Sequence, residues 1–568
     1  MGRYRFVSLV VLVPALAASL VLTGTRPPGP DDDFYAMRKN FELFGAFYGE
    51  LVTNYHTRVD PERLMRAGMD AMLSTLDPWT DFFDEADNVE MDLRYRRILA
   101  DVGLSLSRRD GRVTVLQPDF EAAAYRQGIR TGDVVISVQG QPVDSLSVPD
   151  IHQLLRGEPA TVVEVGVERA GEGELLFRLT REAPIQKTVT FAGRLESDPG
   201  IAVLKLAVFG QGAASELGKA YQDLAATGEI RGVVLDLRGN PGGLVSEAIG
   251  IVGLFVPRGT QVVSMRGRAS ETTRGFRTES NPVAPDVPLV VLMDRSSASA
   301  SEIVAGAVQD LDRGLVVGEP SFGKGLVQTV RPLKYNTSLK VTMSAYYAPS
   351  GRGIHRRIAD GLGPAPAAPA PFTTAGGRPV REGFGIEPDL SVFPFANGPA
   401  DRQSGSVGAA RPGPGPLETA LEREAAFFLF AGVLANEEGE SLRDAAARAR
   451  RLVLPNGTME RFRAWLETRG FEFRTSFEAE VEALDASLEG GDVRAALDRL
   501  RRAAAEDRER SFERESQRLS TRITQEVAAR LMGPEEAVRA LMPDDPWMQA
   551  AGGLLNDQSR YARMLQGS

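Results

Sequence analysis

Short apolar segments alternate with amphipathic ones between residues 186 and 395, and this alternation limits the fold more than any other feature of the chain. The segment Gly232–Leu237 is apolar at almost every position, as is typical of a parallel strand that is covered on both faces. Further strands are predicted at 201–206, 289–293, 314–317, 326–330 and 385–392, and helices at 213–226, 244–255 and 301–311. This order of elements predicts an α/β core over residues 186–395.

The other regions have different patterns, because a chain of 568 residues is too long for one hydrophobic core. Residues 31–95 carry apolar side chains at helical spacing, and residues 96–185 have the short alternating segments of a small β-domain. Residues 396–416 are rich in Gly, Pro and Ser, which predicts a flexible linker. Residues 417–568 are expected to form a helical extension. The predicted fold class is therefore α+β multidomain.

Residues 1–30 have the composition of an export signal or a membrane anchor. Arg3 and Arg5 precede an apolar run over 6–22, which is the order found in signal peptides. Ala15–Ala17 fits a cleavage site, but the run continues past it, so an uncleaved anchor is an alternative. A buried N-terminal helix is the third interpretation. We expect the protein to be exported, either periplasmic or anchored to a membrane on its extracytoplasmic side.

The composition excludes several kinds of chemistry. The chain has no cysteine, which removes disulfides, thiol catalysis and cysteine metal sites. A net charge of −10 argues against a nucleic-acid partner. The three histidines, His56, His152 and His355, lie in different predicted regions, and only His355 rivals a lysine as general base. We expect neither a metal nor a cofactor.

Ser299 is the candidate nucleophile. It follows the predicted strand 289–293 and precedes a helix with a core-facing apolar stripe. Free N–H groups at a helix N-terminus favour negative charge, so an oxyanion would be stabilised there. Ser299 and Glu302 also fit a capping box, and on this motif alone a structural cap is the simpler interpretation.

The turn Gly239–Gly243 adds a second feature to this region. It follows the buried strand 232–237, and its glycines permit backbone amides to approach a ligand closely. Many turns of this kind serve geometry alone. Beside Ser299, however, this turn offers a second oxyanion donor.

Lys324 is the candidate base. The segment Gly318–Lys324 matches the first part of a P-loop, but Gly325 stands where magnesium would need Ser or Thr, and a strand is predicted next. A lysine base must be neutral, which requires burial and a lowered pKa. Phe322 and Leu326 suit such desolvation. A solvated loop lysine is the alternative.

Residues 123–140 resemble the PDZ family, in which this pattern joins a short helix to a strand. The resemblance implies that residues 96–185 form a PDZ domain and that Val102, Gly103, Leu104 and Ser105 form its carboxylate-binding loop. Backbone amides of this loop would hold a peptide C-terminus while the peptide adds a strand to the sheet. A β-domain that only separates other domains is the alternative.

Three further segments resemble the carboxyl-terminal processing (tail-specific) serine proteases: 235–244, 297–303 and 317–325, followed by Gln328. This resemblance extends over roughly residues 31–395. It implies a ClpP/crotonase-like α/β peptidase core with an inserted PDZ domain, a helical N-terminal region and protein substrates bound by their C-terminal tails. The Pro/Ala-rich segment 361–374 and the helices of 417–568 depart from the family pattern, so adaptor binding or self-association through those helices is left open.

The resemblance also implies the role of each site residue. Ser299 matches the nucleophile and Lys324 the general base, while Gln328 matches the residue that orients the lysine. The amides of Gly243 and Ala300 match the oxyanion hole. On an extended strand Lys324 and Gln328 would lie about 13 Å apart, so direct contact requires a turn or a bulge.

We therefore expect an exported serine endopeptidase that captures C-terminal tails with its PDZ domain and cleaves through an acyl-enzyme. Two alternatives belong to other classes. One is a catalytically dead PDZ scaffold. The other is an acyl-thioester enzyme of the crotonase type, which would bind coenzyme A.

Overall fold

The computed structural model describes residues 30–85, 100–109, 111–119, 122–182, 187–268, 273–356, 372–393, 415–471, 473–487 and 494–567. The chain divides into two compact units, Met1–Phe82 and Phe83–Ser568. The predicted signal or anchor, most of the Pro/Ala-rich segment and nearly all of the predicted linker lie outside the described residues. Among the described helices, none has the length and apolar character needed to cross a membrane.

The described residues of the first unit form the helices α2 (Pro30–Asn54) and α3 (Pro61–Leu73). α3 begins as the sequence predicts, because the Asp60 carboxylate accepts hydrogen bonds from the amides of Glu62 (3.0 Å) and Arg63 (3.2 Å). Large apolar side chains of these helices are exposed, and none of those described between residues 34 and 82 is buried. Residues 34–82 therefore form no hydrophobic core among themselves.

The predicted β-domain forms a sheet in the order β2-β3-β4-β6-β7, in which β5 also pairs with β4. Its helix α6 lies against β2, the strand at one edge of the sheet. The elements are β2 (Leu104–Arg109), β3 (Arg112–Pro118), α5 (Ala123–Gln127), β4 (Val134–Val138), β5 (Gln141–Pro142), α6 (Val148–Leu155), β6 (Val162–Arg169) and β7 (Gly173–Thr180).

The predicted α/β core contains a sheet in the order β19-β14-β13-β10-β9-β8, in which only β8 is antiparallel to its neighbour. The returning strand predicted at 385–392 pairs only over its two residues in β19. The strands are β8 (Val189–Leu195), β9 (Asp198–Leu206), β10 (Gly232–Asp236), β13 (Leu289–Met293), β14 (Leu315–Gly318) and β19 (Leu390–Ser391).

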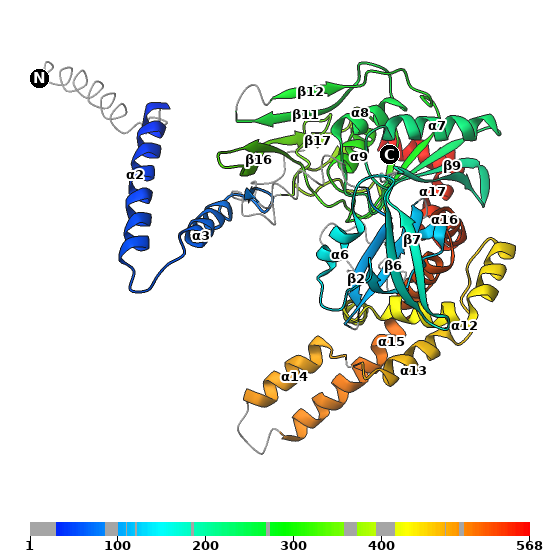
Figure 1. Ribbon diagram of the computed structural model, residues 1–568. Coiled ribbons are helices and arrows are strands. Elements are labelled where there is room, and N and C mark those ends of the chain that lie inside the picture. Colours follow the sequence, from blue (N-terminus) through cyan, green and yellow to red (C-terminus); the bar gives the residue numbers. More distant parts are fainter. Residues whose placement is uncertain are drawn as a thin grey trace, which may run out of the picture. The chain divides into compact units, whose positions relative to one another are not determined.

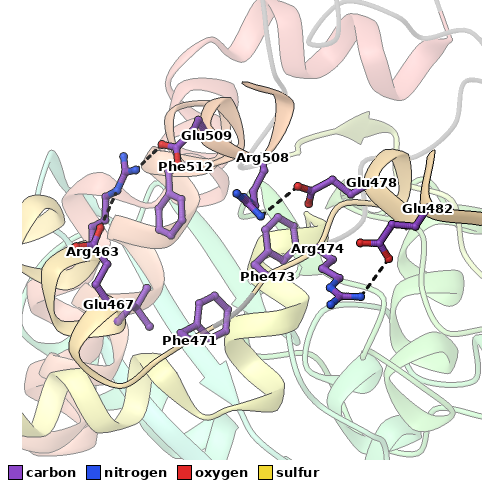
Figure 2. Close-up of a pocket in the computed structure, with 11 residues that line it drawn as sticks. Arg463, Glu467, Phe471, Phe473, Arg474, Glu478, Glu482, Arg508, Glu509 and Phe512 are labelled. Carbon is purple, nitrogen blue, oxygen red and sulfur yellow. Dashed lines mark hydrogen bonds and ion pairs between the residues drawn. The ribbon is translucent and has the colours of Figure 1, made fainter. Parts of the chain in front are cut away.

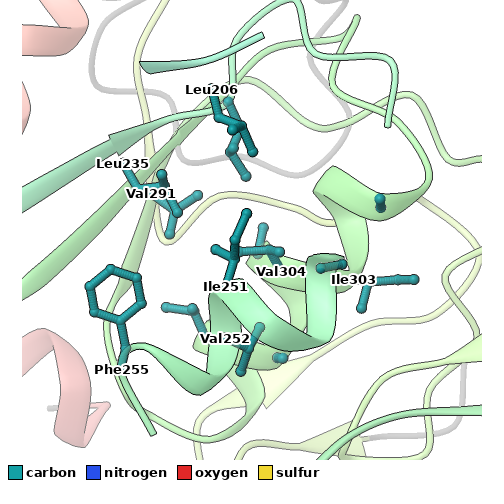
Figure 3. Close-up of a cluster of buried hydrophobic side chains, with 14 of the residues drawn as sticks. Leu206, Leu235, Ile251, Val252, Phe255, Val291, Ile303 and Val304 are labelled. Carbon is teal, nitrogen blue, oxygen red and sulfur yellow. The ribbon is translucent and has the colours of Figure 1, made fainter. Parts of the chain in front are cut away.

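Three helices cover one face of this sheet: α7 (Ala213–Ala226), α8 (Val245–Gly253) and α9 (Ala300–Asp310). Figure 3 shows Ile251 of α8 and Val304 of α9 directed toward Leu235 and Val291 of the strands. All residues of β10 and β13 are buried, as the near-continuous apolar run predicts.

The other face of the sheet is covered by the last helices of the chain, α17 (Pro546–Asn556) and α18 (Gln558–Gln566). Leu554 of α17 belongs to the same buried cluster as Val234 and Val290 of the strands. The Tyr561 hydroxyl accepts from the Leu289 amide (3.0 Å) and donates to the Leu289 carbonyl (2.9 Å). The C-terminal end of the chain therefore returns to complete the α/β core (Figure 1).

The core also contains an antiparallel sheet with strands β11 (Gln261–Gly267), β12 (Arg274–Arg277), β15 (Leu326–Pro332) and β16 (Ser338–Tyr347). Its strand β15 directly follows the segment that carries Lys324. The short strands β1 (Asp81–Phe83), β17 (Phe372–Thr373) and β18 (Pro379–Val380) complete the described β-structure.

The helical C-terminal region has a core of its own and contacts the PDZ-like domain. Arg530 donates to the Thr131 carbonyl of that domain and to the Phe428 carbonyl, both at 3.1 Å, and its burial lowers the pKa of the guanidinium to about 10. The helices are α11 (Pro416–Arg423), α12 (Ala426–Ala449), α13 (Thr458–Thr468), α14 (Ser476–Ser487), α15 (Arg494–Leu531), α16 (Pro534–Leu541) and the 3₁₀ turn η3 (Met542–Asp544).

The packing of α17 predicts that Leu554→Ala destabilises the α/β core. Leu554 is fully buried against the sheet, and a buried Leu→Ala change costs about 2–5 kcal/mol. The midpoint of urea unfolding should fall clearly, as followed by tryptophan fluorescence. Val453→Ala is the control, because Val453 is 60% exposed. Equal stability of the two variants would contradict this account of the second face.

Candidate active site

Ser299 lies where β13 gives way to α9, at the first turn of the helix. Its backbone has φ 54° and ψ −109°, a conformation that costs a residue with a side chain on the order of 1–3 kcal/mol. The turn is fixed by Asp294, whose carboxylate accepts from the amides of Ser296 (2.9 Å) and Ser297 (3.0 Å). Strain of this kind persists only where the surrounding contacts determine the backbone.

The glycine turn predicted to lie beside Ser299 does so. A Cβ atom on Gly242 would lie 2.9 Å from the Ser299 Cβ and 3.0 Å from the Ala300 nitrogen, so no side chain fits there. The Asn240 carbonyl accepts from the Ala298 amide (3.1 Å) and the Ser301 hydroxyl (2.9 Å). These bonds join the turn to the segment of the candidate nucleophile.

The two predicted oxyanion donors are amides at the ends of these segments. Phe209 pairs with the Gly242 carbonyl (2.9 Å) and the Leu244 amide (2.8 Å), so the Gly243 amide between them is directed away from Phe209. The Ala300 amide lies in the first turn of α9, where helix geometry provides no partner.

Glu302 connects Ser299 to Lys324. One of its carboxylate oxygens, Oε2, accepts from the Ser299 amide (2.7 Å) and from the Lys324 amide (2.9 Å). The two amide nitrogens share this one acceptor atom, so the backbones of Ser299 and Lys324 lie close together. The other oxygen, Oε1, accepts from the Ser321 hydroxyl (2.5 Å) and the Gly323 amide (2.7 Å).

The Glu302 carboxyl is fully buried and surrounded by these four donors. Burial raises its pKa above the ordinary value, while the hydrogen bonds act in the opposite direction. All four neighbouring groups are hydrogen-bond donors, so the site suits a carboxylate whose two oxygens both act as acceptors. The sequence identified Glu302 only as a helix cap. Its bonds to the lysine segment, residues 319–325, leave no recognisable pattern in the local sequence.

Lys324 is half-buried in the irregular segment 319–325. Burial lowers the pKa of its ammonium, and the positive charge of Lys340 lowers it further. Strand β15 follows at Leu326, where a P-loop lysine would open a helix. This segment therefore does not continue as a P-loop does.

Gln328 lies on β15 next to a bulge in the pairing with β16. The register shifts between the pairs Val327–Ser344 and Gln328–Thr342, and such a bulge bends the strand locally. The Gln328 amide nitrogen is buried, and within the described part of the chain it has no hydrogen-bond partner.

The three histidines are distributed as the sequence suggests. His56 belongs to the first unit and His152 to α6 of the PDZ-like domain. His355 lies close to the segment 319–325: a Cβ atom on Gly325 would be 2.4 Å from the backbone nitrogen of His355. It is therefore a neighbour of Lys324 along the folded chain.

The predicted carboxylate-binding loop, residues 102–105, belongs to the separate PDZ-like core and is not part of the Ser299 site. The Asp101 carboxylate accepts from the amides of Val102 (2.6 Å) and Gly103 (3.3 Å). The loop thus already holds a carboxylate from its own chain. This role of Asp101 was not predicted, since an adjacent acidic residue is no specific signal.

A pocket of about 440 Å³ lies elsewhere, among the C-terminal helices (Figure 2). Phe471, Phe473 and Phe512 line it, and its arginines are paired with glutamates. It brings together no nucleophile and base. Among the described residues, no group of three His, Asp or Glu side chains is placed to hold a metal ion.

Comparisons with known proteins agree with the class of enzyme that this fold and site define, a serine-type peptidase with a PDZ domain. Residues 200–364 match peptidase family S41, residues 114–169 match the PDZ domain, and residues 417–555 match a family described as "Probable PDZ-protease, C-terminal helical domain".

Named relatives give the family more closely. The carboxy-terminal-processing protease of Bartonella bacilliformis is 32% identical over 56% of this chain and 73% of its own length. CtpB of Bacillus subtilis is 29% identical over 68% of this chain and 78% of its own. The solved structure of the photosystem II D1 C-terminal processing protease is 28% identical in sequence. The match covers 63% of this chain and 88% of that protein, with a TM-score of 0.37. The chain belongs to the carboxy-terminal processing proteases of peptidase family S41.

The bonds of Glu302 predict that Glu302→Gln loosens the lysine segment. An amide offers one acceptor oxygen where the carboxylate has two, so buried donors lose partners at about 1–3 kcal/mol each. Amide hydrogen exchange at Gly323 and Lys324 should become faster, and the melting temperature should fall. The matched control is Glu319→Gln, which removes only the ion pair of Glu319 with the half-exposed Arg295. Unchanged amide exchange at Gly323 and Lys324 would show that the hydrogen bonds of Glu302 do not hold this segment.

Proposed function

We propose that this peptidase is an exported endopeptidase that binds the C-terminal tails of proteins through its PDZ domain and cleaves them with a Ser299–Lys324 pair. The observation that carries the proposal is the shared Glu302 oxygen, which holds the two backbones together by bonds of 2.7 Å to the Ser299 amide and 2.9 Å to the Lys324 amide. A lysine side chain is long enough to reach the serine hydroxyl across this junction. Export is supported by the sequence of residues 1–22.

In the first step the neutral Lys324 amine takes the proton of the Ser299 hydroxyl as Oγ attacks the substrate carbonyl carbon. The carbonyl oxygen becomes negative and accepts from the amides of Gly243 and Ala300. When the C–N bond breaks, the lysine ammonium returns the proton to the leaving amine. Water then gives a proton to the Lys324 amine, attacks the ester and releases the acid, and the proton returns to Ser299.

The environment of Lys324 supports its role as the base. Burial favours the neutral amine by lowering its pKa, and Lys340 adds to this effect. The buried amide of Gln328 suits an orienting role, since its nitrogen can donate to a neutral amine and its oxygen can accept from an ammonium. The bulge beside Gln328 supports this role, because a bulge bends the strand locally and so shortens the distance expected for an extended strand.

Tail capture is supported by the PDZ-like domain. β2 is an edge strand of its sheet, and α6 lies against it, which is the arrangement needed for a peptide to add a strand. The loop before β2 binds the Asp101 carboxylate through two amides. A substrate C-terminus has the same chemical group and would compete for these amides.

The catalytic proposal is tested with an unfolded protein that has a free C-terminal tail, analysed by mass spectrometry. Wild type should release fragments, whereas Ser299→Ala and Lys324→Ala should lose at least about a thousandfold in rate. The control is Ser296→Ala, an exposed serine of the same segment. The wild-type rate should rise with pH toward an apparent pKa below the ordinary lysine value of 10.5, since the amine must lose its proton and its pKa is lowered.

Several outcomes would reject this assignment. Cleavage by Ser299→Ala would exclude the nucleophile, and no cleavage by wild type would favour the PDZ scaffold. If His355→Gln were inactive and Lys324→Ala remained active, His355 would be the general base instead of Lys324. Binding of coenzyme A would favour the acyl-thioester enzyme.

The loop geometry predicts that Asp101→Asn strengthens binding of C-terminal tails. Asparagine keeps an acceptor for the loop amides but removes a charge that repels the incoming carboxylate, an effect on the order of 1 kcal/mol or more. The dissociation constant for a tail peptide should fall about tenfold by calorimetry. A peptide with an amidated C-terminus should show no gain, and neither should Asp144→Asn, an exposed change in the same domain. Equal gains for both peptides would place the tail elsewhere.

A further inference from the structure

The beginning of α17 contacts the residue that precedes the glycine turn. Asp545, the N-cap of α17, pairs with Arg238 (Nη1 to Oδ2, 2.7 Å). On its other edge the Arg238 guanidinium binds Asp236 at the end of β10, with Nε to Oδ1 at 2.8 Å and Nη2 to Oδ2 at 2.7 Å. Arg238 is therefore clamped between the sheet and a helix from a distant part of the chain.

Trp547 adds a second contact of the same helix. Its ring lies 4.9 Å from the Arg238 guanidinium carbon, and its indole nitrogen would be 3.2 Å from a Cβ atom on Gly318. Arg238 directly precedes the turn 239–243, and Gly318 directly precedes the lysine segment 319–325. The first turn of α17 thus lies at the points where both segments leave the sheet.

The charges at this junction do not tolerate the loss of a partner. Asp236 is completely buried, and Arg238 is 13% exposed. Burial opposes the ionisation of Asp236, but Arg238 and Lys205 outweigh it and hold its pKa well below the usual range. Without Asp545, Arg238 would keep only Asp236 among the carboxylates of this junction, and its position would no longer be fixed from two sides.

We propose that Asp545 and Trp547 are positioning residues of the peptidase site. By pairing with Arg238 and packing beside Gly318, α17 sets the geometry of the turn 239–243 and of the lysine segment 319–325. The docked C-terminal helix is then a condition for full activity. This inference rests on the proposed function of Ser299 and Lys324.

The test uses the full chain with Asp545→Asn. Asparagine caps a helix as well as aspartate does, so α17 keeps its cap while the charge that faces Arg238 is lost. The matched control is Asp557→Asn, because Asp557 caps α18 through the Arg560 amide (2.9 Å). Trp547→Phe is the second variant, which keeps an aromatic ring but removes the indole nitrogen.

The measurements are kcat and KM on the tailed substrate, the rate at which a fluorophosphonate modifies Ser299, the melting temperature, and hydrogen exchange at 239–243 and 319–325. Asp545→Asn should lower kcat and the modification rate about 10- to 100-fold, with KM within about twofold and exchange faster in both segments. Asp557→Asn should match wild type. Trp547→Phe should give a smaller loss in kcat.

The outcomes separate this inference from the proposed function. If wild type cleaves through Ser299 and Asp545→Asn has the same kcat, the positioning role is wrong and the function stands. A lower melting temperature with unchanged kcat of the folded enzyme also overturns it, since the contact would be structural only. If wild type neither cleaves nor reacts with the probe, the proposed function fails, and unchanged exchange at 239–243 and 319–325 would reject positioning as well.

Discussion

The arrangement of the site depends on one buried carboxylate, that of Glu302. The segment 319–325 has no regular secondary structure, and backbone bonds provide acceptors for only part of it: the amides of Ser321 and Phe322 donate to the carbonyls of Ile386 and Ser297, both at 3.0 Å. Glu302 provides the missing acceptors and takes the amides of Gly323 and Lys324 as well as that of Ser299. Burying a carboxylate is costly unless donors replace water. Here the donors belong to the segments of the proposed nucleophile and base, so the same bonds offset that cost and fix these segments relative to each other.

Local patterns predicted the elements around the site well. The strand 289–293 and the helix 213–226 have the predicted bounds, because their apolar periodicity reflects burial on the sheet. The Ser299–Glu302 spacing predicted the contact over three residues. It could not predict that the same carboxylate reaches residues 19 to 22 positions further on, since such contacts depend on how two loops pack and leave no periodic trace.

The sequence also did not show which segment covers the second face of the α/β sheet. The apolar run 232–237 indicated a strand buried on both faces, and the helices of 417–568 were expected as an extension. The structure joins these two observations, because α17 and α18 form the second face of the core. An amphipathic helix reveals that it covers something but not what it covers. The ion pair Arg238–Asp545 could not be predicted for the same reason. Arg238 is already explained by its place after a strand, and Asp545 by its role as a helix cap, so neither residue indicates a distant partner.

The C-terminal helices also contact the PDZ domain, shortly before the chain reaches Asp545. Arg530 is buried with the Thr131 carbonyl as acceptor. Between Arg530 and Asp545, α16 packs against β8, and Arg539 lies over the Phe191 ring at 5.8 Å. If the PDZ domain separated from α15, the guanidinium would exchange the Thr131 carbonyl for water, at a net cost of about 1.5–3 kcal/mol for a hydrogen bond to a charged group. The stretch of chain between Arg530 and Asp545 therefore connects the contact with the PDZ domain to the helix that covers the second face of the core.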